Sequence, residues 1–394
     1  MSNQIVPLSS LSVNGKGTYG IAASAVPYAK DKYTYLRITD INDDGTLNID
    51  DLKSVDDPDA CNYILQPNDI VFARTGASTG RNYFYDGSDG TFVYAGFLIK
   101  FSIDPNKVNP LYVKYFCQSQ KYRDWIYSFN TGSTRGNINE RTLAQMPIEL
   151  PSRRQQDLLV ENLSKIDAKI KLNNQINRNL EEQAQALFKS WFVDFAPFGG
   201  EMPADWKTGS LSDIADYLNG LAMQKFRPKD DEVGLSVLKI KELRQGFAGE
   251  DAELCSPSIK SEYIVNDGDV IFSWSGSLLV DLWCGGKCGL NQHLFKVTSE
   301  HYDKWFYYMW TKHHLDRFIF LAADKATTMG HIKREELDKA EVCIPSDSDY
   351  NKISSAVKPL IDRLIANKIE NRTLSTMRDE LLPKLMSGEM ELGC

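Results

Sequence analysis

Apolar residues recur along two long stretches of the chain at alternating steps of four and three, a spacing typical of amphipathic helices. The first series is Leu159, Leu163, Ile166, Ile170, Asn173, Asn177, Leu180, Ala184, Leu187 and Trp191. The same spacing returns 194 positions later as Ile353, Val357, Leu360, Leu364, Asn367, Asn371, Leu374, Arg378, Leu381 and Leu385. Ser152 and Gln155 fit a capping box ahead of the first series, so we predict that a helix begins there.

Each series carries two asparagines at matching places: Asn173 and Asn177, then Asn367 and Asn371. Asparagine in a heptad seam lowers stability and is tolerated mainly where it fixes register and partner. We therefore predict that the two helices pack on each other, with the first asparagine of each facing the second of the other. Connectivity makes this pair antiparallel, and Arg378 would lie opposite Ile166, where its side chain can snorkel to water. The alternative is that each helix covers its own domain independently.

The sequence ahead of each helix repeats as well. Residues 131–151 return as 325–345, with identity at Thr134/Thr328, Gly136/Gly330, Ile138/Ile332, Leu143/Leu337 and Pro151/Pro345. Further upstream, DIVFARTG at 69–76 returns as DVIFSWSG at 269–276. Apolar runs bounded by Gly, Asn, Asp and Pro predict strands in both copies, while the stretches at 110–127 and near 301–320 fit helices.

The repeat predicts an α+β protein with two pseudo-symmetric globular domains separated by a long antiparallel two-helix coiled coil. The expected divisions are 1–150 for the first domain, 151–195 for the first helix, 196–345 for the second domain and 346–394 for the second helix. From Leu159 to Trp191 such a helix would rise roughly 48 Å, equal to about 14 base pairs of DNA. Two related domains on a spacer of this length suit the reading of two separated half-sites.

Composition narrows the class of protein. The length of 394 residues favours more than one core, and no window approaches the roughly 18 apolar residues of a membrane span. The first ten residues lack the features of a secretory signal, so we expect a cytoplasmic protein.

The seven cysteines are scattered and odd in number, which indicates reduced thiols. Only Cys284 and Cys288 are spaced roughly as two cysteine ligands of a zinc ion would be. Because no second pair follows, we favour buried thiols in a turn over a zinc site, and we predict no metal.

The formal net charge of −8 argues against bulk, non-specific affinity for nucleic acid, because that affinity comes from neutralisation of phosphates by Lys and Arg. An acidic chain is still compatible with a local basic cleft, or with a partner that supplies the positive charge. We therefore expect weak DNA binding by the isolated chain.

Polar segments of the repeat offer side chains suited to DNA contact. The candidates in the first copy are Arg74, Thr75, Ser78, Arg81, Ser133, Arg135 and Asn137. Those in the second copy are Trp274, Ser275, Ser277, Asn291, Gln292, His293, Thr327, His331 and Lys333. Arginine suits phosphates and guanine edges, and amide side chains pair with adenine. Each segment also has a plainer interpretation: a solvated turn at 74–81, helix capping near 131–137 and 325–333, and backbone contacts at 291–293.

Three phrases around the first helix resemble the specificity subunit of type I restriction–modification systems: LPSRRQQ at 150–156, IDAKIKLNNQIN at 166–177 and ALFKSWFVDF at 186–195. FSWSGS at 272–277 and GLNQHLFK at 289–296 are similar to the target-recognition domains of that family. The resemblance covers nearly the whole chain. The second helix departs from the pattern, since Leu385-Met386 replaces Trp191-Phe192 and Arg378 interrupts the seam.

The resemblance implies that each domain reads one half of a bipartite, asymmetric DNA target. It also implies that the helices dock two modification subunits, which bind S-adenosylmethionine and methylate adenine, and that a restriction subunit joins for cleavage in anti-phage defence. This chain would then be no enzyme and would itself bind no cofactor.

Two other functions compete with this interpretation. Residues 109–112 (NPLY) are one residue from the NPPY-type motif of adenine methyltransferases, which would make the chain a self-contained enzyme; Pro110 opening a helix is the simpler interpretation. Residues 15–20 spell GxGxxG, but no strand–helix context with a downstream acidic residue surrounds them, and the chain has no P-loop. The second competing function is that of a coiled-coil scaffold without DNA specificity. An aromatic cluster at 191–198 is expected to pack between helix and domain rather than to dock a partner.

Overall fold

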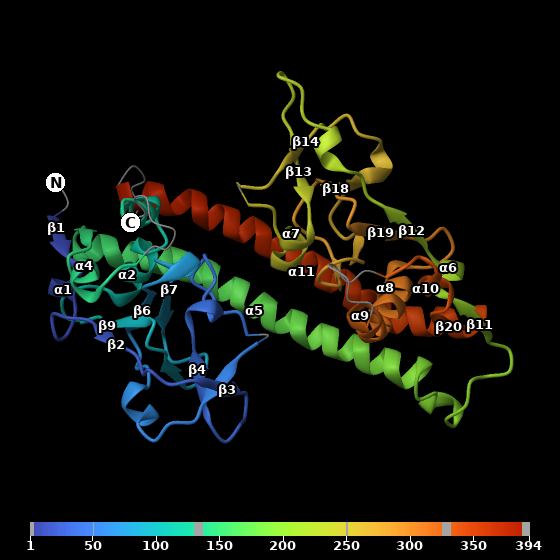
Figure 1. Cartoon of the computed structure of the whole chain (residues 1–394), viewed down its shortest axis with the longest axis horizontal. Coiled ribbons are helices and arrows are strands. Elements are labelled where there is room, and N and C mark those ends of the chain that lie inside the picture. The colour runs from blue at the N-terminus through green and yellow to red at the C-terminus, as the bar shows by residue number, and fades with distance from the viewer. Residues whose placement is uncertain (1–3, 50, 130–136, 250, 325–331, 388–394) are drawn as a thin grey trace. The chain divides into compact units, whose positions relative to one another are not determined.

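The structure is a computed structural model of the 394-residue chain, and it describes residues 4–49, 51–129, 137–249, 251–324 and 332–387 (Figure 1). The chain forms two compact units. Unit 1 comprises Met1–Asp167 with Met377–Cys394, and unit 2 comprises Ala168–Thr376. The division falls within both long helices, whereas the sequence pattern puts domain boundaries at the helix ends.

Unit 1 is built from short strands and short helices, followed by parts of the two long helices. In chain order its short elements are β1 (Gln4–Pro7), α1 (Leu8–Leu11), β2 (Thr18–Tyr19), β3 (Ala25–Pro27), β4 (Tyr33–Leu36), η1 (Ile38–Asp40), β5 (Lys53–Val55), η2 (Ala60–Tyr63), β6 (Asp69–Ala73), η3 (Gly76–Ser78), β7 (Asn82–Tyr85), β8 (Phe92–Tyr94), β9 (Leu98–Ser102), α2 (Pro110–Phe116), α3 (Gln120–Tyr127), α4 (Glu140–Ala144) and β10 (Pro147–Leu150). The predicted helix at 110–127 is thus two helices, because Ser119 caps a second one.

The strands of unit 1 form two four-stranded sheets and one pair. One sheet has the order β2-β9-β6-β7 and is antiparallel. The other has the order β3-β5-β4-β8, in which β4 and β8 are parallel. Strands β1 and β10 pair antiparallel, so the start of the chain is joined to the strand that precedes the first long helix. Residues 70–73 of β6 are buried and alternate between two cores: Ile70 and Phe72 lie in one, and Val71 and Ala73 lie in the other.

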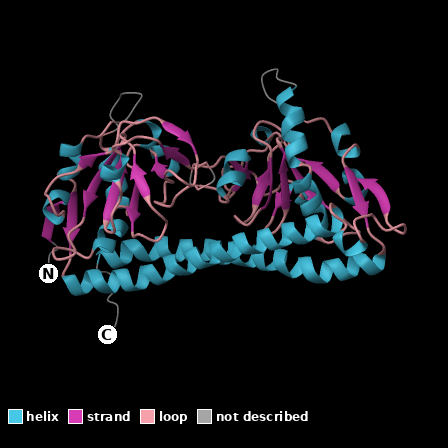
Figure 2. Cartoon of the chain, turned by 90° about the horizontal axis from the view of Figure 1, so that it is seen from below, coloured by secondary structure: helices cyan, strands magenta, loops and turns pink. Residues whose placement is uncertain are grey.

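Unit 2 repeats this construction. Its short elements are η4 (Ala196–Phe198), β11 (Lys207–Ser210), α6 (Leu211–Ile214), β12 (Asp216–Asn219), η5 (Met223–Lys225), β13 (Leu235–Leu238), α7 (Ile240–Gln245), β14 (Leu254–Cys255), η6 (Ser261–Tyr263), β15 (Ile264–Val265), β16 (Val270–Ser273), β17 (Leu279–Leu282), β18 (Cys288–Leu290), β19 (Leu294–Thr298), α8 (Lys304–His313), α9 (Leu315–Asp324), α10 (Glu335–Asp338) and β20 (Glu341–Ile344). Strands and helices are mixed in both units, as the predicted α+β class requires (Figure 2).

The first sheets of the two units match strand for strand, and the second sheets share three strands, β5-β4-β8 and β14-β13-β18. The outer strand differs, because β3 lies beside β5 in unit 1 and β15 lies beside β18 in unit 2. The first sheet is β12-β19-β16-β17, and β11 pairs with β20 as β1 does with β10. In the second sheet, β14-β13-β18-β15, strands β13 and β18 are parallel like β4 and β8. An ion pair recurs as well: Lys100 lies 3.0 Å from Asp69 in unit 1, and Lys296 lies 2.9 Å from Asp269 in unit 2. The internal repeat in sequence is therefore a repeat in fold.

One glycine in each unit lets two backbones cross at close range. A Cβ on Gly20 would lie 2.3 Å from the carbonyl oxygen of Ala95, and one on Gly220 would lie 2.2 Å from that of Asn291. At the next residue in each unit, Ile21 forms a parallel bridge to Ala95 and Leu221 to Asn291. Only a residue without a Cβ fits there, because real Cβ atoms do not approach backbone oxygens so closely.

The two long helices are α5 (Arg153–Phe192) and α11 (Asp347–Ser387). In unit 1, Leu159 and Leu163 of α5 lie in the same core as Leu382 and Met386 of α11. In unit 2, the C-terminal half of α5 and the N-terminal half of α11 share a core. As numbering rises along α5 it falls along the facing part of α11, so the helices are antiparallel, as predicted. The capping pattern is present in part, since the N–H of Ser152 donates to the side chain of Gln155 (3.1 Å).

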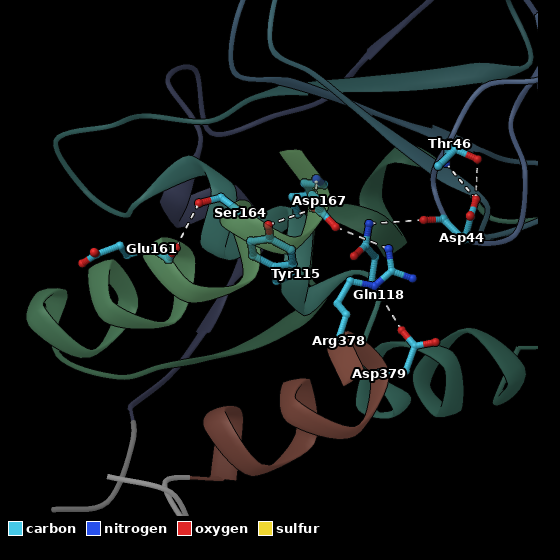
Figure 3. Close-up of polar contacts among 10 residues, drawn as sticks. Asp44, Thr46, Tyr115, Gln118, Glu161, Ser164, Asp167, Arg378 and Asp379 are labelled. Carbon is cyan, nitrogen blue, oxygen red and sulfur yellow. Dashed lines mark hydrogen bonds and ion pairs between the residues drawn. The ribbon is translucent and has the colours of Figure 1, made fainter. Parts of the chain in front are cut away.

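Arg378 does not snorkel to water, and that expectation is wrong. Its side chain is 12% exposed, and Nη1 lies 3.4 Å from Oδ1 of Asp167 on α5 (Figure 3). The other oxygen of Asp167 accepts from Nζ of Lys114 (2.6 Å) and from the hydroxyl of Tyr115 (2.9 Å). Nε of Arg378 also donates to Asp379 (3.1 Å). The heptad pattern predicted the wrong role because Asp167 lies beside the seam position rather than in it.

The aromatic cluster at 191–198 packs largely within unit 2. Phe192 is 2% exposed and lies against Trp206, Trp305 and Trp310. Trp191 is only partly buried, and its neighbour at 5.5 Å is Phe198. The end of α5 is thus fastened to the core of unit 2, which favours the packing interpretation of this cluster.

Candidate nucleic-acid interface

The predicted contact segments of unit 1 meet at the end of β6. The N–H of Arg74 donates to the carbonyl oxygen of Phe97 (3.1 Å), and the carbonyl oxygen of Arg74 accepts from the N–H of Ile138 (2.8 Å). Thr75 also forms an isolated antiparallel bridge to Asn137. The segment at 74–81 is therefore joined by backbone contacts to the turn before β9 and to residues just after 130–136.

The Arg74 guanidinium is held between two exposed aromatic rings. Its Cζ lies 5.2 Å from the ring centre of Tyr19 and 5.8 Å from that of Phe97, and these rings are 42% and 55% exposed. Nε of Arg74 is buried and has no hydrogen-bond partner among the residues that the structure describes. The hydroxyl of Tyr19 accepts from the N–H of Glu140 (3.2 Å), which steadies the ring. A cation in this setting is oriented but not neutralised.

Arg81, the second arginine of the segment, is engaged by its own domain. Nε and Nη2 donate to the two oxygens of Asp43 (2.6 and 3.2 Å), and Nη1 donates to the carbonyl oxygen of Ile41 (3.2 Å). Ser78 is buried and Thr75 is half-buried. Of the candidates between 74 and 81, Arg74 is thus the one whose charge is not already paired within the described part of unit 1.

In unit 2 the equivalent position is Trp274. Its N–H donates to the carbonyl oxygen of His293 (3.4 Å), and its carbonyl oxygen accepts from Ile332 (3.1 Å). The indole Nε1 donates to Oδ1 of Asn219 (3.1 Å). The indole lies beside the rings of His293 and Phe295, at 6.4 and 5.6 Å between centroids. The backbone contacts of Arg74 and Trp274 are therefore the same, although their side chains are unlike.

The polar residues around Trp274 bond mainly to one another. His293 Nδ1 lies 2.9 Å from the hydroxyl of Ser275, and the side chain of Asn291 accepts from the N–H of His293 (3.2 Å). Gln292 Nε2 lies 3.4 Å from Nε2 of His293. Asn291 is 7% exposed, so its amide braces the turn. Ser277 is exposed, and its carbonyl oxygen accepts from the hydroxyl of Ser273 (2.9 Å).

Four of the predicted contact residues lie outside the described residues: Ser133, Arg135, Thr327 and His331. Asn137 and Lys333, at the edges of the same two segments, are exposed. Sequence reasoning missed Tyr19, Phe97 and Asn219. The signal that could have found them is the repeat itself: Tyr19 and Asn219 are 200 positions apart, and Phe97 is 196 positions before His293.

The cysteine pair does not form a recognisable metal site. Within the described ranges, no group of three or more His, Cys, Asp or Glu side chains could hold a metal ion. Burial raises the pKa of the Cys284 thiol to about 11 and that of the Cys288 thiol to about 12. Cys284 and Cys288 are 6% and 1% exposed, so both thiols are buried.

The four seam asparagines bond in the two pairs that the pattern predicts. Nδ2 of Asn173 donates to Asn371 (2.9 Å), and Nδ2 of Asn367 donates to Asn177 (2.9 Å). Asn173 also reaches Glu370 (2.8 Å). Asn173 and Asn367 are 0% and 1% exposed, so these amides are withdrawn from water.

We expect Asn177→Ala to lower the free energy of unfolding of unit 2 by about 1–3 kcal/mol, because the buried amide of Asn367 would lose its acceptor. Replacing both Asn177 and Asn367 by leucine should restore or exceed wild-type stability, since neither polar group remains. Urea unfolding of the full chain measures both effects. Asn179→Ala, on the exposed side of α5, is the control and should change stability by less than about 0.5 kcal/mol. A double variant as unstable as Asn177→Ala would contradict this account.

No helix among the described residues is long and apolar enough to cross a membrane.

One strand arrangement is built twice and carries unlike side chains at the same position, Arg74 in unit 1 and Trp274 in unit 2, as expected of a protein with two related binding domains. The comparison with protein families agrees: the model of the type I restriction modification DNA specificity domain matches residues 15–182 and again 203–373. The chain therefore belongs to the family of type I restriction–modification specificity proteins, and its two repeats are DNA specificity domains.

Curated relatives belong to the same family. The chain is 26% identical to the type I restriction enzyme MjaIX specificity subunit of Methanocaldococcus jannaschii, over 71% of this chain and 69% of the relative. It is 20% identical to the HindI specificity subunit of Haemophilus influenzae, over 84% and 89% of the two chains. A solved structure of a type I restriction–modification S subunit from M. genitalium matches with a TM-score of 0.57 and 15% identity, over 97% of this chain and 95% of that one, which shows a shared fold.

Proposed function

We propose that each repeat reads one half of a bipartite, asymmetric DNA target, so that this chain gives a type I complex its sequence specificity. The observation that carries this proposal is the recurrence of one strand arrangement with different side chains at one position, Arg74 in unit 1 and Trp274 in unit 2. A repeated scaffold with different contact residues in its two copies allows two half-sites of different sequence to be read by a single chain.

The long helices are proposed to set the spacer between the half-sites and to dock two modification subunits. Their lengths of 40 and 41 residues, and the charged residues along their exposed faces, support this role. The modification subunits would bring S-adenosylmethionine and methylate adenine, and a restriction subunit would join for cleavage. The complex would act in the cytoplasm, where it meets the DNA.

The chain itself is proposed to be no enzyme and to bind no cofactor. The NPLY segment, its best candidate for methyl transfer, is occupied by structural contacts. The side chain of Asn109 accepts from the N–H of Leu111 (3.1 Å) and donates to Asp157 (2.8 Å). Tyr112 is 1% exposed, and its hydroxyl donates to the carbonyl oxygen of Glu149 (2.5 Å). Neither side chain is presented to a base.

Sequencing of methylated adenines tests this function. The chain assembled with its modification subunits and S-adenosylmethionine is expected to methylate one bipartite sequence with an unread spacer. The purified chain alone, given labelled S-adenosylmethionine and the same DNA, is expected to transfer no methyl groups. Its net charge of −8 also predicts that DNA binding in gel shifts strengthens when the modification subunits are added. Methyl transfer by the chain alone, or methylation without sequence preference, would overturn the proposal.

A further inference from the structure

Three neighbouring strand ends carry one side-chain cluster in each unit. In unit 1 the cluster is Tyr19 at the end of β2, Arg74 after β6 and Phe97 before β9. In unit 2 it is Asn219 at the end of β12, Trp274 after β16 and His293 before β19. We name this the three-residue platform.

Backbone pairing shows that the two platforms are equivalent. Tyr19 pairs with Ile99 across β2 and β9, and Asn219 pairs with Phe295 across β12 and β19. The residue after each is the crossing glycine, whose N–H donates to Leu98 in unit 1 (3.2 Å) and to Leu294 in unit 2 (3.0 Å). Together with the shared backbone contacts of Arg74 and Trp274, these bonds place all three members of each platform at the same points of the fold.

The unit 1 platform has the features of a ligand site. Exposed aromatic rings beside an arginine are unusual on a surface, because they expose apolar area without a packing partner. The rings restrict the guanidinium without supplying any hydrogen-bond acceptor, and its Nε is buried without a partner among the described residues. Desolvation of a donor is costly unless it finds a partner, which favours a ligand that supplies acceptors to this guanidinium.

A guanine edge fits this site better than a phosphate does. An arginine restrained by stacking presents its planar fork in one orientation, which matches the O6 and N7 acceptors of guanine. The fork can also bind a phosphate, but a phosphate is bound equally well by a flexible point charge such as lysine and does not require a guanidinium held in one orientation. The unit 2 platform has no arginine or lysine, and its contact surface is an indole with an amide and an imidazole. The two units therefore differ in the chemistry that they offer at the same place.

We infer that the three-residue platform is the base-reading position of each repeat, and that in unit 1 Arg74, oriented by Tyr19 and Phe97, reads a guanine in the first half-site. The inference rests on the proposed function. Trp274 holds the corresponding position for the second half-site, where no arginine–guanine contact is available.

The test compares methylation profiles of the assembled complex on DNA carrying randomised positions in both half-sites. Arg74→Ala is expected to lower discrimination at one G·C pair of the first half-site about 10- to 100-fold, and to leave the second half-site unchanged. Arg74→Lys keeps the charge but lacks the fork, so it should lose discrimination at that same pair. Phe97→Ala should weaken it partially, and Trp274→Ala should relax only the second half-site.

Three results would overturn the inference: an unchanged preference in Arg74→Ala, a uniform loss of methylation with the preference intact, or full discrimination in Arg74→Lys. The second of these would identify a phosphate contact. A wild-type complex that shows no bipartite target would instead refute the proposed function, so the two failures are distinguishable. Amide hydrogen exchange of each variant establishes that unit 1 is folded, and Arg74→Lys remains decisive where alanine disturbs the rings.

Discussion

Gly220→Ala is expected to destabilise unit 2 by about 3 kcal/mol, at the upper end of what overpacking costs. A Cβ at this position would lie 2.2 Å from the carbonyl oxygen of Asn291 and 2.4 Å from that of Leu290. Both are backbone atoms, so the clash can be relieved only by moving β12 away from the strand crossing. Amide hydrogen exchange in the full chain should show lost protection in β12, β18 and β19, with unit 1 unchanged.

The repeat supplies a reciprocal experiment. Gly20→Ala should produce the same loss in β2, β8 and β9 of unit 1, because a Cβ there would lie 2.3 Å from the carbonyl oxygens of Tyr94 and Ala95. Gly199→Ala is the matched control: Gly199 has a φ of +80°, but nothing lies within 4 Å of an added Cβ. It should cost only about 1 kcal/mol for the left-handed backbone. Equal effects of Gly199→Ala and Gly220→Ala would contradict the crossing argument.

Asp167→Ala is expected to lower the free energy of unfolding of unit 1 by roughly 2–4 kcal/mol, because two cations would lose their shared carboxylate. Asp167 accepts from Lys114 and Tyr115 and pairs with Arg378, and its side chain is 19% exposed (Figure 3). Glu161→Ala is the control on the same helix. Glu161 pairs with Lys165 at 2.7 Å, its side chain is 61% exposed, and its loss should cost less than about 0.5 kcal/mol.

The stability that Asp167 confers should depend on pH. Burial raises the pKa of Asp167, but the neighbouring Lys114 ammonium and Arg378 guanidinium outweigh burial and hold this pKa below its ordinary value. A carboxyl whose pKa is lower when folded stabilises the protein above its unfolded pKa of about 3.9 and loses that effect as pH falls through the folded pKa. The difference between wild type and Asp167→Asn in urea unfolding should therefore be largest near neutral pH and shrink below about pH 4. A difference that is constant from pH 7 to pH 3 would refute the ion-pair explanation.

The seam of the helix pair shows how far a pattern can reach. Steps of four and three identify the buried face, and asparagines within it have few places to bond except to each other, so the pairs Asn173–Asn371 and Asn177–Asn367 follow from spacing alone. Arg378 shows the limit. Its partner Asp167 is adjacent to the seam, and Lys114 and Tyr115 come from a domain helix that no heptad rule includes.

The predicted DNA-contact residues also show what the sequence can predict and what only the structure reveals. Arg74 and Arg81 are seven positions apart in one polar segment, and composition treats them alike. Folding brings Asp43 to Arg81 and leaves Arg74 between Tyr19 and Phe97. Whether an arginine pairs within its own domain or is presented to a ligand depends on residues 23 to 55 positions away, which only the folded domain brings together.

By itself the sequence determined that this protein has two copies of one α+β domain, that two heptad-patterned helices pair antiparallel, and that the family is that of type I specificity proteins. These properties follow from the heptad spacing and from the internal sequence repeat, which can be recognised without knowing which distant residues are in contact. The tertiary structure decided where the units divide, which glycine allows the backbones to cross, how Arg378 is buried, and which side chains form the three-residue platform. Each of those depends on atoms that are distant in the chain and meet only when the sheets close.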